Sequence, residues 1–473
     1  MITFDVLTLK AFYDEQSGFL SGARINKIQQ PTRREFVFTL RKNSESRQLY
    51  ININPEFYHI SFMSRENAAK RIIEIPQKPP MFCMLLRKYL ENSRIAKVNQ
   101  PKNERILEFY IETYNEVGEM IYLCLACEFM GKHSNMILYN YDTNIIIGCA
   151  HNVGAEKSRE REIYGGLPYV YPPKQNQTNK TWASLVKEQG NVVCVNDLID
   201  DYYSGYIAEV KFKNLKTTYK SLIEQKLKKV NKSLKQMEYK VLSDSDSDKY
   251  RLYGDLIMAN LYNLNDFSKE ISVYDYENDK QITIRLDETK SLKDNANRFY
   301  KLYNKAKTAK GKLEALIEES NVKKSYLEDI LYSINASDTI DELFEISSEV
   351  LETKSESKKS KKVFEILTLT TENDTRIYIG KNNKQNDYII SKLASEDDLW
   401  FHVHNCAGSH VLLKTNNLTD ELIMKCAKLA KEYSSVKNSS KIGVIYTKRK
   451  YLRKPPGAAL GYVTYRNEKE IVV

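Results

Sequence analysis

Three of the six histidines, His402, His404 and His410, lie in one short segment, residues 397–410, together with Trp400. On a β-strand, His402 and His404 would project from the same face, a geometry that can hold a metal ion. No aspartate, glutamate or cysteine is placed to complete the ligand set, so we expect no metal. We interpret Trp400, His402 and His410 as side chains that are either buried or in contact with the phosphates of an RNA.

The pair Cys124 and Cys127 has the spacing of half a zinc site. No second CxxC or CxxH follows it, and the segment Met120–Cys127 has the composition of a buried strand. Positions three apart on a strand point to opposite faces, so one metal ion could not bind both thiols. The seven cysteines are odd in number and scattered, which indicates free thiols in a reducing compartment rather than a disulfide framework. We expect neither a metal nor a cofactor.

Basic residues gather in two stretches of the chain. Residues 208–240 contain ten lysines against three glutamates, and residues 431–462 contain eight lysines and arginines against one glutamate. Such local fields are expected where a protein contacts the phosphate backbone of RNA. An equally good interpretation of the first stretch is a solvated helix face, whereas the second interleaves tyrosines with cations, as base stacking requires. The candidate RNA contacts in the second stretch are Lys448, Arg449, Lys450, Arg453 and Lys454.

The sequence lacks the short motifs of common enzyme classes, namely GxxxxGK[ST], GxSxG, HExxH and paired CxxC. We therefore expect a binding protein without catalytic residues. The first five residues lack the basic and apolar parts of a secretion signal, and the longest apolar run, Met120–Cys127, is far shorter than the ~20 residues that a membrane helix needs. The sequence predicts a cytoplasmic protein that does not contact a membrane.

The elements that must position these residues begin with a mixed region. Residues 1–173 combine helix and strand patterns and predict an α+β domain. A helix is expected over Pro80–Asn92, and its apolar stripe is assigned to Met81, Met84, Leu85 and Tyr89. Strand patterns are clearest over residues 36–40, 48–53, 106–113 and 120–128. Residues 174–205 are weakly patterned and predict a connector.

Two later segments have apolar residues at alternate spacings of four and three, which is typical of a coiled coil. The first, residues 206–248, has the stripe Ile223, Leu227, Val230, Leu234, Met237 and Val241. The second, residues 298–336, has the stripe Leu302, Ala306, Ala309, Leu313, Leu316, Ser320, Lys323, Leu327, Ile330 and Ile334. Each is long enough to bury its stripe on the other, so we expect an antiparallel hairpin. Residues 249–297 contain two strand-like pieces, 270–274 and 281–286, and predict a small module at the hairpin tip.

The end of the chain is a further mixed region. Residues 337–362 are interpreted as a helix followed by a linker rich in serine and lysine over 353–362. Residues 363–473 predict a second α+β domain, with strands over 363–368, 376–380, 442–446 and 461–465 and a helix over 419–433. The expected fold class is therefore multidomain α+β, with two such domains and a long coiled-coil hairpin that carries a small module at its tip.

Four longer motifs, in their order along the chain, resemble the NFACT family. They are MFCMLLRKYL at 81–90, EFMGKHSN at 128–135, KYRLYGDL at 249–256, and LWFH at 399–402 with GSH at 408–410. The segment RKPPGA at 453–458 also resembles the C-terminal domain of that family. The resemblance covers nearly the whole chain. It implies an NFACT-N domain with a glycosylase-like fold over residues 1–173 and an NFACT-R domain over residues 363–473.

The resemblance implies a ribosome-associated quality-control factor. Such factors bind a large ribosomal subunit that is obstructed by peptidyl-tRNA and recruit alanyl-tRNA for untemplated C-terminal alanine tailing of the stalled chain. The ribosome makes the peptide bonds, so the factor positions RNA and needs no catalytic site of its own. The implied partners are the large ribosomal subunit, its rRNA, peptidyl-tRNA, alanyl-tRNA and, as a further candidate, a small RNA-binding stabilising factor.

The same resemblance assigns tRNA recognition to an acidic and basic pair in the NFACT-N domain. The matching positions are Glu104 and Arg105, with glutamate where the family has aspartate, and Asp5 is a second acidic candidate. Without the resemblance, Arg105 would be interpreted as an exposed charge at a strand edge. The first two motifs add three candidate RNA contacts, Arg87, Lys132 and His133.

Two features depart from what the resemblance implies. The family has a helix-hairpin-helix region before the first long helix, and residues 174–205 leave little room for it, so we expect it to be reduced or absent. Ile2 and Thr3 stand where related DNA glycosylases have an imine-forming proline and a neighbouring glutamate, so glycosylase activity is rejected. The alternative function is a surface adhesin that binds extracellular matrix such as fibronectin, a role that an older family label suggests.

Overall fold

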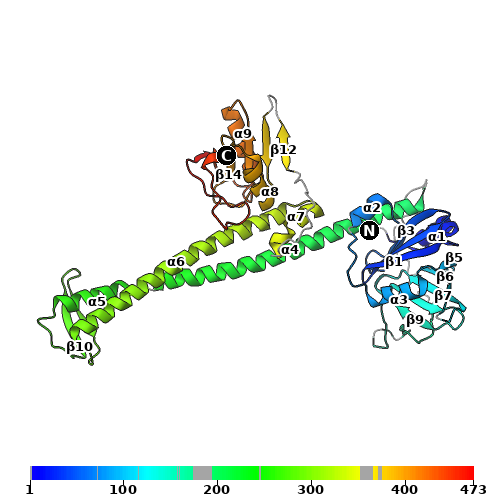
Figure 1. Ribbon diagram of the computed structural model, residues 1–473, viewed down its shortest axis with the longest axis horizontal. Helices are drawn as coiled ribbons and strands as arrows, with labels where there is room; N and C mark the ends of the chain where they lie inside the picture. Colours follow the sequence, from blue (N-terminus) through cyan, green and yellow to red (C-terminus); the bar gives the residue numbers. More distant parts are fainter. Residues whose placement is uncertain are drawn as a thin grey trace. The chain divides into compact units, whose positions relative to one another are not determined.

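The computed structural model describes residues 3–71, 73–115, 117–156, 158, 160–173, 194–243, 247–351, 366–370 and 375–473. The chain contains two compact units, Met1–Lys211 and Phe212–Val473 (Figure 1). Both units combine helices with antiparallel sheets, which confirms the predicted multidomain α+β class. None of the described helices is both long enough and apolar enough to cross a membrane.

The N-terminal unit is built on a nine-stranded antiparallel sheet in the order β4-β3-β2-β1-β5-β6-β7-β8-β9. Its strands are β1 (Arg24–Thr32), β2 (Glu35–Lys42), β3 (Glu45–Asn52), β4 (His59–Phe62), β5 (Arg94–Asn99), β6 (Ile106–Tyr114), β7 (Met120–Glu128), β8 (Asn135–Asn140) and β9 (Ile146–Cys149). β1 and β5 pair in register at Arg24 and Arg94, near one end of each strand. The sheet therefore consists of two halves, β1–β4 and β5–β9, that are joined at one end.

Apolar residues of both halves share one core with α1 (Val6–Leu20) and α3 (Met81–Leu90). The helix predicted over Pro80–Asn92 is confirmed, but its predicted apolar stripe is wrong at Met81 and Met84, whereas Leu85 and Tyr89 pack against the core. The buried residues of α3 are Phe82, Cys83, Leu86 and Leu90. Met81 is 88% exposed and Met84 is 52% exposed. Both sets of residues recur with a helical period, so only the position of the helix against the sheet decides which set is buried.

Alternate connections of an antiparallel sheet lie at the same end of its strands. Within β1–β4 these are the connections β1–β2 and β3–β4, and within β5–β9 they are β5–β6, β7–β8 and the exit from β9. The hydrogen bond from Arg105 to Tyr58 and the close approach of Gly131 to Tyr58 bring the two sets together at one edge, which we call the loop edge. It comprises residues 33–34, 53–58, 100–105, 129–134 and 150–153. Glu104, Arg105, Lys132 and His133, which the sequence suggested as candidate contacts, all lie in this edge.

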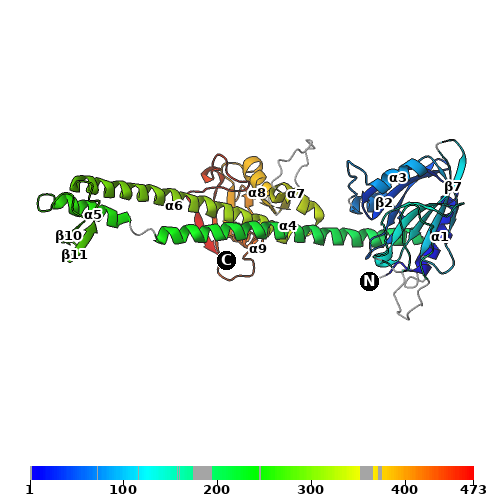
Figure 2. The same cartoon turned by 90° about the horizontal axis from the view of Figure 1, so that it is seen from below.

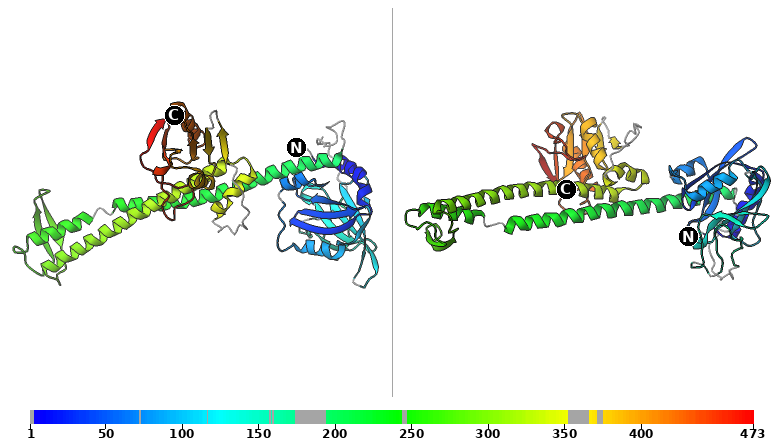
Figure 3. Two further views of the ribbon diagram at one scale, coloured as in Figure 1. Left: turned by 45° about the horizontal axis from the view of Figure 1, so that its top comes forward. Right: turned by 60° about the horizontal axis from the view of Figure 1, so that its bottom comes forward.

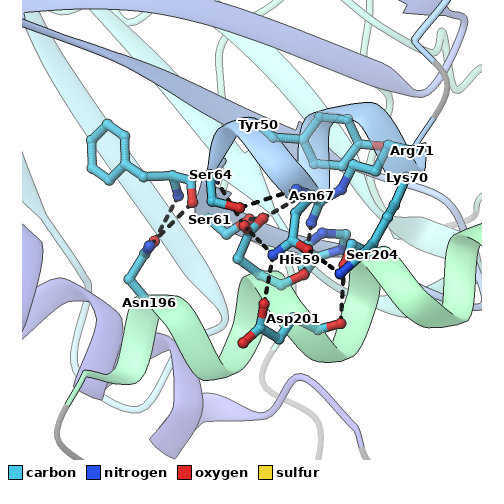
Figure 4. Close-up of polar contacts among 12 residues, drawn as sticks. Tyr50, His59, Ser61, Ser64, Asn67, Lys70, Arg71, Asn196, Asp201 and Ser204 are labelled. Carbon is cyan, nitrogen blue, oxygen red and sulfur yellow. Dashed lines mark hydrogen bonds and ion pairs between the residues drawn. The ribbon is translucent and has the colours of Figure 1, made fainter.

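The first turns of α4 (Val195–Ser243) belong to the N-terminal unit, and a buried polar network fixes them to the sheet (Figure 4). Asp200 of α4 accepts hydrogen bonds from Arg71 at the end of α2 (Arg65–Arg71), at 2.5 Å, and from Asn67, at 2.8 Å. Asn196 bonds to both backbone groups of Phe62.

Residues 195–205, predicted to be part of a connector, are therefore helical. Their inward face mixes the buried polar residues Asn196, Asp200 and Ser204 with Ile199 and Tyr203, so the apolar pattern that identifies a helix is interrupted there. Residues 174–193, the rest of the predicted connector, lie outside the described residues. The reduction of the helix-hairpin-helix region stays a prediction.

In the C-terminal unit, α4 from Phe212 onwards runs beside α6 (Leu292–Ala336), as the views in Figure 2 and Figure 3 also show. Lys216 of α4 donates to the carbonyl oxygens of Asn335 and Ser337, at 2.9 and 2.7 Å. Residues early in α4 thus lie beside the end of α6, so the two helices are antiparallel.

The predicted stripes of these two helices are buried over part of their length. Ile223 and Leu227 of α4 share a core with the end of α6 and with α7 (Ile340–Leu351). The α6 residues in this core are Leu327, Ile330 and Ile334. Ala309 and Leu316, in the middle of the second predicted stripe, are exposed, which contradicts that part of the stripe.

A second small core lies where α5 (Ser247–Ala259) meets the first turns of α6. It includes the hairpin of β10 (Glu270–Asp275) and β11 (Lys280–Arg285), which contain the two strand-like pieces predicted there. Its buried residues include Ile257, Ile271, Ile284 and Phe299.

The chain ends in a six-stranded antiparallel sheet in the order β12-β13-β15-β14-β16-β17. The strands are β12 (Leu367–Thr370), β13 (Arg376–Ile379), β14 (Leu399–Val403), β15 (Val411–Lys414), β16 (Gly443–Lys448) and β17 (Lys469–Val472). One face packs on α9 (Asp420–Glu432), and the opposite face carries Trp400 and Ile445. Residues 461–465, predicted as a strand, form just an isolated bridge between Thr464 and Arg453. The predicted linker 353–362 lies outside the described residues.

Polar contacts join this sheet to α7 through α8 (Asn383–Tyr388) and the residues before it. Lys381 forms an ion pair with Glu342 at 2.9 Å, and Asn382 and Gln385 both donate to Glu345. A single helical face of α7 thus accepts a row of hydrogen bonds from the start of α8. A π-helical turn, Ile389–Leu393, follows α8.

Candidate nucleic-acid interface

Arg105 lies in the loop edge directly before β6 and is half-buried. Its Nη1 donates a hydrogen bond of 2.9 Å to the hydroxyl of Tyr58, in the β3–β4 connection. The backbone carbonyl oxygen of Arg105 accepts a hydrogen bond from the backbone N–H of Phe129. Both the backbone and the side chain of Arg105 are therefore fixed by hydrogen bonds. Among the described residues, no carboxylate forms an ion pair with Arg105, which leaves this guanidinium able to bind an anion.

Glu104 and Asp5 lie close to this arginine. The amide nitrogen of Gln100 donates to the carbonyl of Glu104 at 3.0 Å and to the carbonyl of Val6, the first residue of α1, at 3.5 Å. Asp5 caps α1 by accepting from the backbone N–H of Thr8 at 2.8 Å. Burial raises the pKa of Tyr58, the charge of Arg105 lowers it, and the charge of Asp5 raises it, so both charges act on one phenol.

Lys132 and His133 are exposed in the 3-10 turn Gly131–His133, which joins β7 to β8. The hydroxyl of Ser134 accepts from the backbone N–H of Met130 and closes this turn. Gly131 has a φ of 63°, and a Cβ built on it would lie 3.9 Å from Cε1 of Tyr58. The turn therefore brings Lys132 and His133 to the same side of the molecule as Arg105.

The EFMGKHSN motif also positions this turn from beneath. Glu128 is buried and is paired with Arg161, and it accepts a further hydrogen bond from Tyr169 at 3.0 Å. Burial raises the pKa of Glu128, and the Arg161 pairing lowers it. Phe129 packs edge-on against Phe4, at 5.4 Å between ring centroids. In this motif, Glu128 and Phe129 thus anchor the turn in the domain, and Lys132 and His133 are exposed on it.

Sequence reasoning missed several residues of the loop edge. Tyr58 and Gln100 touch Arg105 and Glu104 from other connections, and no motif marked them. Arg33 and Arg34 lie in the β1–β2 turn, and both lower the pKa of His151, although burial of the imidazole is the larger cause. Arg33 and Arg34 could have been identified from the sequence, because two adjacent basic residues stand there between two strand patterns.

Together, the loop edge gathers cations that are suited to the phosphates of a nucleic acid. Arg105, Lys132 and His133 come from two connections, and the hydrogen bond to Tyr58 joins the two halves of the sheet there. A guanidinium can donate two parallel hydrogen bonds to one phosphate, whereas a lysine acts as a mobile point charge. This arrangement binds and orients an anionic ligand.

Arg87, also proposed from the sequence as an RNA contact, is used within the fold. Its Nε donates to the carbonyl of Ile28 in β1 at 2.8 Å, and it forms an ion pair with Glu91 at 3.7 Å. Its guanidinium therefore ties α3 to β1. A contact of Arg87 with RNA stays a prediction.

Trp400 and His410, proposed as RNA contacts in the C-terminal domain, are buried, with 1% and 4% of their surface exposed. The His410 and Trp400 rings meet edge to face at 5.2 Å, and the His402 ring stacks on Trp400 at 5.8 Å. Burial lowers the pKa of His402 to about 4 and that of His410 well below its ordinary value. Both imidazoles are neutral near pH 7 and supply no charge for a phosphate. Of the two stated alternatives, Trp400 and His410 follow the buried one, whereas His402 is half-buried.

His404 lies in the turn after β14, and its Nδ1 is 3.5 Å from a carboxylate oxygen of Glu470. Because β14 ends at Val403, His404 does not share a strand face with His402 as expected. Cys124 and Cys127 lie on opposite faces of β7, in two different apolar clusters, which confirms the prediction for that pair. Burial raises the pKa of both thiols.

The five cations proposed near the end of the chain differ in their surroundings. Lys448 and Lys450 both form ion pairs of 3.0 Å with Asp397, and Lys454 pairs with Asp387. The Nε of Arg449 donates to the carbonyl of Ile390, in the π-helical turn, at 2.8 Å. Arg449 thus has a role within the fold and its RNA contact stays a prediction, whereas the side chain of Arg453 is exposed and is the strongest candidate of the five.

The lysines of the first basic stretch also divide into two groups. Lys216 bonds to carbonyls at the end of α6, and Lys226 donates to the carbonyl of Val350 at the end of α7, at 2.9 Å. Cations stabilise the negative end of a helix dipole, so these lysines act as caps. Lys228, Lys229 and Lys232 are exposed further along α4.

Two known families of protein domains match this chain. The family of NFACT N-terminal and middle domains matches residues 5–193 and 181–363. The NFACT protein RNA binding domain matches residues 362–466. The first match contains the loop edge, and the second contains the C-terminal sheet.

Similar proteins align over the full chain. The Rqc2 homolog RqcH of Bacillus subtilis is 27% identical over 564 residues, which cover 100% of this chain and 98% of the relative. The Rqc2 homolog RqcH of Streptococcus pneumoniae is 27% identical over 547 residues, with the same two coverages. A structure of the C-terminal part of the fibronectin/fibrinogen-binding protein from Streptococcus suis covers 55% of this chain and 94% of that chain, at 27% identity and a TM-score of 0.44. Because the two family matches together span nearly every residue, the chain belongs to the NFACT family.

Proposed function

We propose that this protein is a ribosome-associated quality-control factor whose loop edge binds tRNA through Arg105. The observation that carries the proposal is the half-buried Arg105 guanidinium, which is held by Tyr58 and has no carboxylate partner among the described residues. A buried arginine normally has such a partner, because desolvation of an unpaired charge is costly. A phosphate group would supply the missing negative charge.

The similarities support the ribosomal part of the proposal. Relatives named Rqc2 homolog RqcH align over the full chain, and the C-terminal region matches an RNA binding domain. In the proposed function, the protein binds a large ribosomal subunit obstructed by peptidyl-tRNA and recruits alanyl-tRNA for C-terminal alanine tailing. The stalled chain would be extended by the ribosome, and this protein would position RNA.

The proposed tRNA contacts are Glu104, Arg105, Asp5, Lys132 and His133. Arg105 and Lys132 would neutralise phosphates, and the release of counterions from the RNA would drive binding. Glu104, whose backbone is fixed by Gln100, would accept hydrogen bonds from a base or from a ribose hydroxyl. Exposed lysines of α4 and Arg453 would add contacts to rRNA.

The first test compares Arg105→Ala with Arg41→Ala. Arg41 is an exposed arginine near the end of β2, at the sheet edge opposite the loop edge, so both variants remove one positive charge from the N-terminal unit. We expect Arg105→Ala to abolish tRNA co-purification from cells and Arg41→Ala to leave it unchanged. Equal tRNA occupancy in the two variants would show that Arg105 does not bind tRNA.

The identity of the tRNA is tested by sequencing the RNA that co-purifies with the protein. A dominant tRNA for alanine is expected, and an even mixture of tRNAs would contradict alanine tailing. Cell fractionation tests the alternative of a surface adhesin. The proposal requires sedimentation with large ribosomal subunits, and a protein found mainly at the cell surface would overturn it.

A further inference from the structure

The loop edge contains a buried residue that the proposed tRNA site depends on. Tyr58 is 7% exposed, so its ring offers little surface to a ligand. Its hydroxyl accepts the 2.9 Å hydrogen bond from Nη1 of Arg105, and the centre of the guanidinium is 5.9 Å from the centroid of its ring. Among the described residues, this phenol is the one side-chain hydrogen-bond partner of Arg105.

Other arginines of the same unit are fixed by carboxylates. Arg47 pairs with Glu45, Arg71 with Asp200 and Arg161 with Glu128. A carboxylate partner compensates the charge of the guanidinium and competes with an anionic ligand. A phenol hydroxyl accepts a hydrogen bond but carries no charge near neutral pH, and the pKa of Tyr58 is raised further by burial. The partner of Arg105 therefore fixes its direction without neutralising it.

The position of Tyr58 is itself fixed by its own connection. Asn52 accepts from the backbone N–H of Asn54 at 2.8 Å, and Asn54 accepts from that of Glu56 at 3.1 Å. These two turns order the backbone between β3 and β4. The next residue, His59, stacks on Tyr203 of α4 at 4.1 Å between ring centroids.

Gly131 completes the enclosure of the phenol. A Cβ at this position would lie 3.9 Å from Cε1 of Tyr58 and 3.8 Å from the carbonyl oxygen of Pro55, so the β7–β8 turn lies directly against the ring. The same turn presents Lys132 and His133 to solvent. Tyr58 therefore contacts Arg105 and lies beside the turn that carries Lys132 and His133.

We infer that Tyr58 is a positioning residue, which directs the guanidinium of Arg105 toward an RNA phosphate while leaving its charge uncompensated. The inference rests on the proposed function, because it needs Arg105 to bind tRNA. Tyr58 itself touches no ligand. Its effect on binding acts through Arg105 alone, since an arginine that is already fixed loses less side-chain freedom when it binds.

The experiment measures the affinity of the full-length protein for fluorescently labelled, unfractionated bacterial tRNA at several salt concentrations. The variants are Tyr58→Phe, Arg105→Ala and the double variant, and Tyr122→Phe is the matched control. Tyr122 lies near the start of β7, at the opposite end of the sheet, and its hydroxyl contacts Met120. Thermal unfolding of each variant checks that the fold is intact.

We expect Tyr58→Phe to weaken binding about tenfold or less, because it removes one hydrogen bond to a charged group. Its salt dependence should equal that of the parent, since no charge is removed. Arg105→Ala should weaken binding more and should lower the slope of log affinity against log salt by roughly 0.7 to 0.9, the value for one lost phosphate contact. Tyr58→Phe should have no further effect on Arg105→Ala, and Tyr122→Phe should bind as the parent does.

The outcomes separate the inference from the proposed function. If Arg105→Ala binds tRNA normally, the proposed site fails and the role of Tyr58 fails with it. If Arg105→Ala weakens binding and Tyr58→Phe does not, or if the two effects add in the double variant, the site stands and the positioning role is overturned. If Tyr58→Phe is unstable, Arg105→Lys takes its place, because it keeps the charge and removes the guanidinium that Tyr58 directs. It should weaken binding with an unchanged salt dependence, and binding equal to that of the parent would overturn the positioning role.

Discussion

Arg71 at the end of α2 donates a 2.5 Å hydrogen bond to Asp200 of α4, and the two side chains are 0% and 2% exposed. Asp200 also accepts from Ser61, Ser64 and Asn67, so its carboxylate is fully used within the N-terminal unit. The pair fixes the first turns of the long helix to the sheet that carries the loop edge (Figure 4). A buried charge pair of this kind is strongly destabilising when one member is removed.

Replacing one member of this pair should therefore weaken the N-terminal unit. Arg71→Met and Asp200→Leu are each expected to lower the free energy of unfolding by about 3–5 kcal/mol, because each leaves an uncompensated buried charge. Urea unfolding followed by circular dichroism measures this. The exposed pair Lys10 and Asp14 on α1 is the control, and Lys10→Met should leave the stability nearly unchanged. Equal effects at the two sites would contradict a buried, structural pair.

The pH dependence of stability should report on Asp329 in α6. Burial, with smaller contributions from the charges of Glu328 and Glu349, raises its pKa to about 7, against a hydrogen bond from the backbone N–H of Gly408 that lowers it. The folded state thus holds a proton that the unfolded chain releases at lower pH. The stabilisation is complete below the unfolded pKa of 3.8 and is lost as the pH rises through about 7.

Asp329→Asn should remove this dependence. We expect the variant to be more stable than the parent at pH 8, by on the order of 4 kcal/mol at ~1.4 kcal/mol per pKa unit, and similar to it below about pH 4. Thermal unfolding of both proteins across this range is the measurement. A constant difference between them at all pH values would show that Asp329 does not titrate in this window.

Trp400 should contribute to stability and not to RNA binding. Trp400→Ala is expected to lower the free energy of unfolding by roughly 3–5 kcal/mol, since it empties a large buried volume next to Ile445 and Leu452. Trp400→Phe keeps most of that volume and should bind RNA as the parent does. Arg453→Ala, at an exposed side chain of the same domain, should weaken RNA binding and leave the unfolding temperature unchanged. Filter binding with labelled rRNA fragments distinguishes the two roles, and weaker binding by Trp400→Phe would restore Trp400 as an RNA contact.

The lysines of α4 should divide in the same way. Lys226→Met loses the hydrogen bond to Val350 at the end of α7 and should lower stability by about 0.5–1.5 kcal/mol, with little effect on RNA affinity. Lys228→Met, at an exposed position two residues further along, should lower RNA affinity and leave the stability nearly unchanged. Chemical unfolding and salt-dependent RNA binding are measured on both variants. If both lose RNA affinity equally, the capping role of Lys226 is not its main one.

Much of the fold is determined by local patterns in the sequence. The α3 and α9 helices, the strands in β2, β6, β7, β10 and β11, and the opposite faces of Cys124 and Cys127 follow from periodicity and composition, because side-chain direction is fixed by the secondary structure. Four motifs, in their order along the chain, indicated the family. Periodicity could not decide which face of α3 is buried, and it missed the start of α4, whose buried face mixes polar and apolar residues.

The tertiary structure alone decided what each candidate side chain does. Lys132 and Trp400 were both suggested as RNA contacts, but one lies in an exposed turn and the other in a core, since burial depends on segments far away in the sequence. The sequence by itself indicated Arg105 and the family. Only the packing of the β3–β4 and β5–β6 connections revealed that Tyr58 holds this arginine, because the two residues are far apart in the chain and meet where the halves of the sheet come together.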